Sequence, residues 1–398
     1  MATTSGRPGF VFLAVLCLVA VAGQVGSFIY LPALPAIAAE FGSSEAGAQA
    51  TLTAYLVGTC LALVVYGPLS DQLGRRRMLV VSGIVFVTAS ITCANADSLA
   101  GLTLARAAQG LGSVAGIITA RATIRDVYPL PQVSRSISIL TASMAVAPAI
   151  SPVLGAAILS VVDWRATFLV AAFVSAASVT LAFAVIPVGR RALSGPDMRD
   201  GLRGLFASPT YRSCVVISSA TNGAFMVMMA GSPFVLMDIY GLSELAYAGS
   251  MAMVLLSFAV VAVATGGLMV KFGARRTMAF GIAPMTAGAA GVVLVSVLLP
   301  DPLLLLAMLA LTIAAMGLIV PTGHTAMLEP FPALAGTAVS LAQLVATLFG
   351  AFAVTLYGQL TAGTPAGLAL SMAGLCSIAV LGWSWLPHHA KLRHPSAS

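Results

Sequence analysis

The chain has 398 residues, of which 59% are hydrophobic and 8% are charged, and its formal net charge is +7. About a quarter of the residues of an average soluble domain are charged, so this chain has too few charges to cover a surface that faces water. The composition excludes a disordered chain, a coiled coil and an ordinary soluble enzyme. It indicates a protein that lipid surrounds over most of its surface.

Apolar runs of about 20 residues, the length that a helix needs to cross a bilayer, follow one another along the chain. They predict an all-α membrane protein with twelve transmembrane helices, near residues 10–38, 47–69, 78–95, 99–121, 136–160, 165–187, 211–236, 247–270, 278–299, 302–322, 336–360 and 366–386. A transmembrane β-barrel would instead show alternating apolar and polar residues.

The Lys and Arg residues predict the orientation of these helices. If the N-terminus is cytoplasmic, seventeen of the nineteen fall on the cytoplasmic side, whereas Arg165 falls outside and Arg106 falls within a helix. The positive-inside rule therefore predicts a multi-pass protein of the cytoplasmic (inner) membrane with both termini in the cytoplasm. The positive net charge reports this orientation and contact with anionic lipid, and gives no support to nucleic-acid binding.

The chain contains an internal repeat. Residues 41–77 align with residues 240–276 without a gap, and ten of these 37 positions are identical. We expect two pseudo-symmetric six-helix bundles, the architecture of many secondary transporters, with a cargo site near the midplane between them. The predicted organisation is an N-terminal bundle over 1–187, a cytoplasmic linker over 188–210, a C-terminal bundle over 211–387 and a cytoplasmic tail over 388–398.

The segment Gly67–Arg77 predicts a tight turn between two helices, with one carboxylate, Asp71, beside three guanidinium groups. Such a cluster can form a lock that one conformation keeps and another breaks, or it can simply anchor the loop. The segment resembles motif A of the major facilitator superfamily, although Gln72 stands where a basic residue is common. The resemblance implies a gating role for Gly67, Asp71, Gly74, Arg75 and Arg76.

Arg106 is the one basic residue predicted at membrane depth, where a charge costs several kcal/mol unless it is paired or hydrated. A structural Arg would bond to carbonyls of the first helix or to Gln109. The run Leu102–Gly112 resembles motif B of the same superfamily, and the resemblance implies a role for Arg106 in proton coupling.

The segment Ala147–Gly155 places two prolines in the fifth helix, where each removes a backbone hydrogen bond. An ordinary kink at a helix interface would have the same pattern. The segment resembles motif C, the motif of drug antiporters, with Ala147 in place of a usual glycine. This resemblance implies a conformational role for Pro148, Pro152 and Gly155.

Three further segments narrow the resemblance to the bicyclomycin-resistance (Bcr/CflA) group of drug:proton antiporters. They are Ile29–Pro35, Tyr128-Pro129 and Asp163-Trp164-Arg165. Members of the group usually carry an Asp two residues before Tyr30, where this chain has Phe28. None of the twelve acids is predicted near the bilayer centre, so a neutral or anionic cargo fits better than a cationic one.

These resemblances predict a secondary active transporter that exports small, fairly apolar, drug-like compounds by proton antiport, and hence multidrug efflux and antibiotic resistance. The alternatives are a facilitator, a metabolite exporter with other coupling, a polytopic membrane enzyme and a channel. We expect a monomer that is not an enzyme and needs no cofactor or metal; its partners are a small-molecule substrate, protons and the lipid bilayer. The candidate substrate-binding residues are Tyr30, Tyr55, Asn222, Phe225, Met226 and Gln343.

Overall fold

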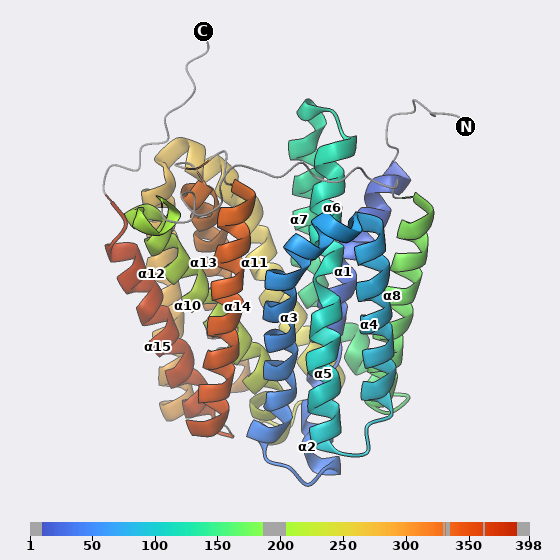
Figure 1. The fold of residues 1–398 in the computed structure, drawn as a ribbon. Coiled ribbons are helices and arrows are strands. Elements are labelled where there is room, and N and C mark those ends of the chain that lie inside the picture. The colour runs from blue at the N-terminus through green and yellow to red at the C-terminus, as the bar shows by residue number, and fades with distance from the viewer. Residues whose placement is uncertain (1–9, 186–203, 329–330, 332–334, 361–362, 388–398) are drawn as a thin grey trace, which may run out of the picture. The chain divides into compact units, whose positions relative to one another are not determined.

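The computed structural model describes residues 10–185, 204–328, 331, 335–360 and 363–387. The regular elements of this part of the chain are helices (Figure 1). The chain divides into two compact units, residues 1–193 and residues 194–398. The predicted tail and most of the predicted linker lie outside the described residues.

The described residues of the first unit form nine helical elements. They are α1 (Phe10–Phe28), η1 (Leu31–Ala33), α2 (Leu34–Glu40), α3 (Glu45–Leu73), α4 (Arg75–Ala94), α5 (Leu99–Ser113), α6 (Ala115–Val127), α7 (Leu130–Leu159) and α8 (Arg165–Val185). Helix α1 packs against α7 and α8, while α5 packs against α3 and α4.

The main helices of the second unit are α10 (Pro209–Pro233), the π-helical segment η2 (Phe234–Ile239), α11 (Glu244–Phe272), α12 (Ala274–Leu298), α13 (Pro302–Leu328), α14 (Ala335–Leu360) and α15 (Pro365–Ser384). Helix α10 packs against α14 and α15, and α13 packs against α11 and α12. Each unit therefore uses the same set of helix pairs, in the same chain order.

Eleven helices in the described residues are long and apolar enough to cross a membrane. The segment predicted as a helix over 99–121 is helical but breaks at Val114 into α5, of 15 residues, and α6, of 13 residues. Neither piece spans a bilayer alone, because a spanning helix needs about 20 residues. The break separates the part of this segment that carries Arg106 from the part that follows Val114.

The turns that flank α3 and α11 have the same backbone geometry. Gly42 and Gly241 precede these helices with φ values of 57° and 70°, and Gly74 and Gly273 follow them with φ values of 85° and 78°. Glycine adopts these positive angles without the strain that a Cβ would cause. Both helices have 29 residues, so the sequence repeat corresponds to a repeated helix with matching turns.

Candidate functional site

Arg106 is the largest fully buried side chain in the described part of the chain, and the only charged one among its buried residues. It projects from α5, whose N-terminal end is capped by the Ser98 hydroxyl, which accepts from the Gly101 N–H. A buried guanidinium without partners would lose several kcal/mol of hydration. Its surroundings must therefore stabilise the charge.

Hydrogen bonds provide the first part of this stabilisation. One Arg106 amino group donates to the Gly26 carbonyl of α1 at 2.8 Å and to the Gln109 Oε1 at 2.5 Å. The Gln109 amide donates in turn to the Ser90 hydroxyl of α4 at 2.7 Å. The Arg106 Nε and second amino group have no hydrogen-bond partner among the described residues. Both structural partners predicted for Arg106, a carbonyl of the first helix and Gln109, are thus present.

Aromatic rings provide the second part. The Arg106 guanidinium lies over the Tyr30 ring at 4.0 Å, the Tyr55 ring at 4.4 Å and the Phe168 ring at 5.6 Å. A desolvated cation over a ring face gains about 2 kcal/mol or more. Four elements of the first unit thus meet at this charge: α1, the turn before η1, α3 and α8.

The two tyrosines are themselves fixed by hydrogen bonds. The Tyr55 hydroxyl donates to the Gly23 carbonyl of α1 at 2.5 Å, and the Tyr30 hydroxyl lies 3.2 Å from the Thr51 hydroxyl of α3. Both rings are buried within the first unit. The structure therefore brings together three predicted residues, Tyr30, Tyr55 and Arg106. It also shows that the tyrosine rings hold Arg106.

The aromatic contacts continue from Arg106 to an ion pair at the end of α2. Phe168 packs on Tyr30, with ring centroids 5.5 Å apart, and on Trp164, with ring centroids 6.0 Å apart. The Trp164 indole donates to Glu40 at 2.5 Å. Arg165 donates to both oxygens of the same carboxylate, at 2.7 and 3.1 Å. This series of contacts joins the buried cation to the start of α8.

Phe28, which replaces the Asp common in the group that the chain resembles, is buried at the end of α1. The described acids lie elsewhere: Asp97, Asp163 and Asp301 in loops, Glu40, Glu45 and Glu244 at helix ends, and Asp238 exposed in η2. The described side chains therefore offer Arg106 no buried carboxylate as a counter-charge.

The motif A segment forms the end of α3, the turn at Gly74 and the start of α4. The Arg76 guanidinium lies 3.7 Å above the Phe183 ring of α8. In the second copy, Arg275 lies 5.2 Å above the Trp383 ring of α15 and donates to the Leu386 carbonyl. Arg76 and Arg275 are equivalent in the repeat. Arg76 thus joins the start of α4 to α8, and Arg275 joins the start of α12 to α15.

The structure describes the backbone of three predicted gating residues, Gly67, Asp71 and Arg75, but not every side chain. Gly67 and Asp71 lie within α3, but the side chain of Asp71 is outside the described part of the structure. Arg75 is the first residue of α4. The predicted gating role of this segment stays a prediction.

The motif C segment lies in the C-terminal part of α7, with Pro148 and Pro152 inside the helix. Gly155 faces α1 so closely that a Cβ atom there would overlap the Ile29 carbonyl oxygen. The residue type is therefore required for the contact between α7 and the end of α1, immediately before Tyr30. Motif C thus contacts the segment that leads to the Arg106 cage, by which we mean the Tyr30, Tyr55 and Phe168 rings around the guanidinium.

The predicted substrate residues of the second unit lie on α10 and α14. The Asn222 amide donates to the Ala346 carbonyl at 2.8 Å, and Met226 packs beside Gly350. Phe225 is half-buried on α10, whereas Gln343 is exposed on α14, and its amide contacts Thr347 at 3.3 Å. The structure thus brings Asn222 and Met226 together against α14.

Sequence reasoning missed several residues that hold the site. Phe168 beside Arg106, Ser90 of the amide network and Phe183 beneath Arg76 were not predicted. Each is an ordinary residue in an apolar run, and its partner lies on another helix. The one available signal was the buried charge itself, because a cation at membrane depth requires rings or acceptors around it.

Comparison with known proteins identifies the fold family. The profile of the family described as "Major Facilitator Superfamily" matches residues 16–354. The chain belongs to this superfamily. Membership indicates a transporter rather than an enzyme, and with the apolar helices it shows a multi-pass membrane protein.

Relatives of this superfamily member confirm the resemblance to the bicyclomycin-resistance group. The chain is 27% identical to "Multidrug resistance protein D" of Escherichia coli over 96% of each chain. It is 25% identical to "Bicyclomycin resistance protein homolog" of Haemophilus influenzae, over 95% of this chain and 96% of the relative. The crystal structure of a D-xylose-proton symporter has the same fold, with a TM-score of 0.80 and 15% identity over 96% of this chain and 99% of that one.

Proposed function

We propose that this chain exports small, fairly apolar compounds, drug-like molecules and antibiotics among them, by proton antiport with alternating access. The observation that carries the proposal is the match, over nearly the full length, to relatives named for multidrug and bicyclomycin resistance. The cargo and the direction of transport come from that relationship. Both termini are proposed to be cytoplasmic, as the distribution of Lys and Arg indicates.

Arg106 is proposed to take part in coupling transport to protons. It is fully buried, two of its nitrogen groups have no hydrogen-bond partner in the described residues, and its other contacts are neutral. An unpaired charge in a low-dielectric site responds strongly to any charge that approaches or leaves. A proton or a cargo group that enters this unit would therefore change the energy of Arg106.

The uncompensated charge of Arg106 also bears on the cargo. A cationic cargo would need a buried carboxylate, and the described side chains offer none near Arg106. Neutral or anionic compounds avoid this repulsion, which is strong at low dielectric. We therefore expect lipophilic cations to compete weakly with neutral cargo, and strong competition by tetraphenylphosphonium would contradict this part of the proposal.

Transport by the purified full-length chain in proteoliposomes tests the proposal. Vesicles with an imposed pH gradient would be offered bicyclomycin and a panel of other uncharged antibiotics. Uphill accumulation that dissipates the pH gradient is the expected result. If the antibiotics only equilibrate across the membrane, at a rate that does not depend on the pH gradient, the protein is a facilitator. If no compound of the panel is transported, a metabolite exporter is favoured.

A further inference from the structure

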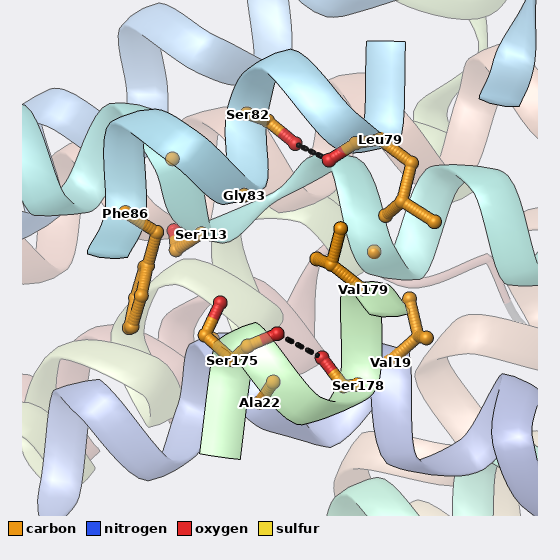
Figure 2. A pocket seen from close by; sticks show the side chains of 13 residues that line it. Val19, Ala22, Leu79, Ser82, Gly83, Phe86, Ser113, Ser175, Ser178 and Val179 are labelled. Carbon is orange, nitrogen blue, oxygen red and sulfur yellow. Dashed lines mark hydrogen bonds between the residues drawn. The ribbon is translucent and has the colours of Figure 1, made fainter. Parts of the chain in front are cut away.

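A small pocket lies in the first unit, beside the Arg106 cage. It is lined by residues of α1, α4, α5, α6 and α8, and Figure 2 shows the side chains around it. Its lining includes four hydroxyl groups, from Ser82, Ser113, Ser175 and Ser178. Because lipid cannot hydrogen-bond to these groups, a partner for them must come from protein or from water.

Three of the hydroxyls already donate their proton to a carbonyl of their own helix. Ser82 donates to Leu79 at 3.0 Å, Ser113 to Gly110 at 2.7 Å and Ser178 to Ser175 at 2.8 Å. The Ser113 oxygen also lies 3.3 Å from the Thr59 hydroxyl of α3. Each serine oxygen has two lone pairs, so all three can still accept a hydrogen bond. The Ser175 hydroxyl has no hydrogen-bond partner among the described residues, so it can donate into the pocket. The lining thus provides both acceptors and a donor.

The size of the pocket decides which ligand it can take. Its volume is about 20 Å³, and about 10–15 Å³ on the same measure is enough for one water molecule. No drug-like molecule fits this volume. Cavities that stay dry are lined by apolar groups, whereas polar cavities with two or more partners hold ordered water.

We propose that this pocket is an internal water-binding site, which holds one water molecule between the serine hydroxyls of α4, α5 and α8. The water donates one proton to the Ser82 oxygen of α4 and the other to the Ser113 oxygen of α5, and it accepts from Ser175 of α8, so that three helices are joined without a charged group. The pocket contains none of the predicted cargo residues and no residue of motifs A or C, whereas Gly112, the last residue of motif B, is part of its lining.

The water site adjoins the Arg106 network at two lining residues. The Gly23 carbonyl accepts the Tyr55 hydroxyl that holds one ring over Arg106. The Phe86 carbonyl accepts the Ser90 hydroxyl, at 2.7 Å, and Ser90 accepts from Gln109. The bound water therefore lies beside the two carbonyls, of Gly23 and Phe86, that fix Tyr55 and Ser90 in the Arg106 network.

Radiolytic hydroxyl labelling of the purified full-length protein tests the site. X-rays convert a bound water into a hydroxyl radical that oxidises the nearest reactive side chain, and mass spectrometry locates the added oxygen. Phe86 lines the pocket, and Phe234, in the second unit, is an equally buried Phe, with 1% of each exposed. We expect Phe86 to be oxidised several-fold faster than Phe234. Equal, slow oxidation of both would overturn the proposal.

A matched pair of variants of α8 localises the water. Ser175→Val removes the donor and fills the pocket, and should lower Phe86 oxidation to the level of Phe234. Thr180→Val changes an exposed hydroxyl that bonds only to the Ala176 carbonyl of its own helix, and should leave Phe86 oxidation unchanged. Fast Phe86 oxidation that persists in folded Ser175→Val protein would contradict the site. The comparison of Phe86 with Phe234 in the unaltered protein is decisive even if Ser175→Val fails to fold.

Discussion

The two units of this transporter share one scaffold and differ in what they bury. Both use the same helix pairs, and both place a glycine of positive φ on each side of a 29-residue helix. Helices α5 and α13 begin 203 residues apart, at Leu99 and Pro302, and this offset aligns Arg106 with Leu309. Both side chains are fully buried. The duplication has therefore kept the packing positions, while one unit has a charge where the other has an aliphatic side chain.

Replacing Arg106, the buried charge that only the first unit has at this position, should reduce transport more than any other change proposed here. Arg106→Met should lower proton-coupled transport by more than about tenfold, because hydrogen bonds to a charged group contribute about 1.5–3 kcal/mol and the charge itself is lost. Leu309→Met conserves volume at the aligned position and should leave transport within about twofold, since such swaps cost little. Initial rates of uphill transport under one fixed pH gradient measure both.

Two outcomes would contradict a coupling role for the Arg106 guanidinium. If Arg106→Met kept its coupling, the charge would be a structural feature alone. If Arg106→Lys restored transport fully, the cation would matter but the planar group over Tyr30 and Tyr55 would not. Thermal unfolding of each variant separates a loss of fold from a loss of coupling.

A second difference lies in helix packing: α7 of the first unit contacts the chain directly after α1 through Gly155, whereas Gly374 of the second unit makes no such contact. Gly155→Ala places a methyl group on the Ile29 carbonyl, so we expect a loss of about 1–3 kcal/mol and a lower midpoint of thermal unfolding. Gly374, on α15 of the second unit, has open space where a Cβ would be. Gly374→Ala is therefore the matched control, and its midpoint should stay the same or rise. Equal midpoints for the two variants would show that α7 can move away from α1 without cost.

Much of the scaffold could be predicted from the sequence, because it depends on periodic and local signals. Apolar runs marked the helices, and the repeat at Gly74 and Gly273 marked turns that the structure confirms as backbone conformations of positive φ. The break at Val114 was not predicted, although the Gly112-Ser113 pair directly before it is of a kind at which helices commonly kink, because such a pair permits a break without requiring one. A break of this kind depends on packing against other helices.

The candidate site was predicted only in part, for a physical reason. Arg106 was identifiable because charge at membrane depth is costly. Phe168 was not, because its contact with Arg106 depends on how α8 packs on α1 and α5, which no local pattern contains. Tyr30 and Tyr55 were predicted as cargo residues, and their contacts with the guanidinium depend on the same packing. Their proposed contact with cargo stays a prediction.

Arg76 and Arg275 occupy the same position in the two copies of the repeat, and a smaller change in stability would show whether both fix one helix to another. Removing the stack of Arg76 on Phe183 should cost about 0.5–2 kcal/mol, and removing that of Arg275 on Trp383 should cost a similar amount. A double-mutant cycle of Arg76→Met with Phe183→Leu, followed by thermal or denaturant unfolding, isolates the contact from general packing. A favourable interaction energy in both units would show that each arginine fixes the start of one helix to the last helix of its unit. A favourable interaction energy in the second unit alone would leave Arg76 with a role in membrane orientation only.

The smallest expected effect concerns the ion pair at the far end of the aromatic series in the first unit. Arg165 and Glu40 are 31% and 40% exposed, and such pairs contribute about 0.2–1 kcal/mol at most. Glu40→Gln should therefore lower stability slightly, and the difference should shrink as salt is raised, because salt screens exposed charges. Asp163→Asn is the control, since the Asp163 carboxylate is 56% exposed and 3.9 Å from the Arg165 guanidinium, and Asn keeps an oxygen that can accept from the Arg165 backbone N–H. A loss for Glu40→Gln that salt does not reduce would show that the carboxylate acts mainly by accepting from Trp164, and hence by holding the rings that reach Arg106.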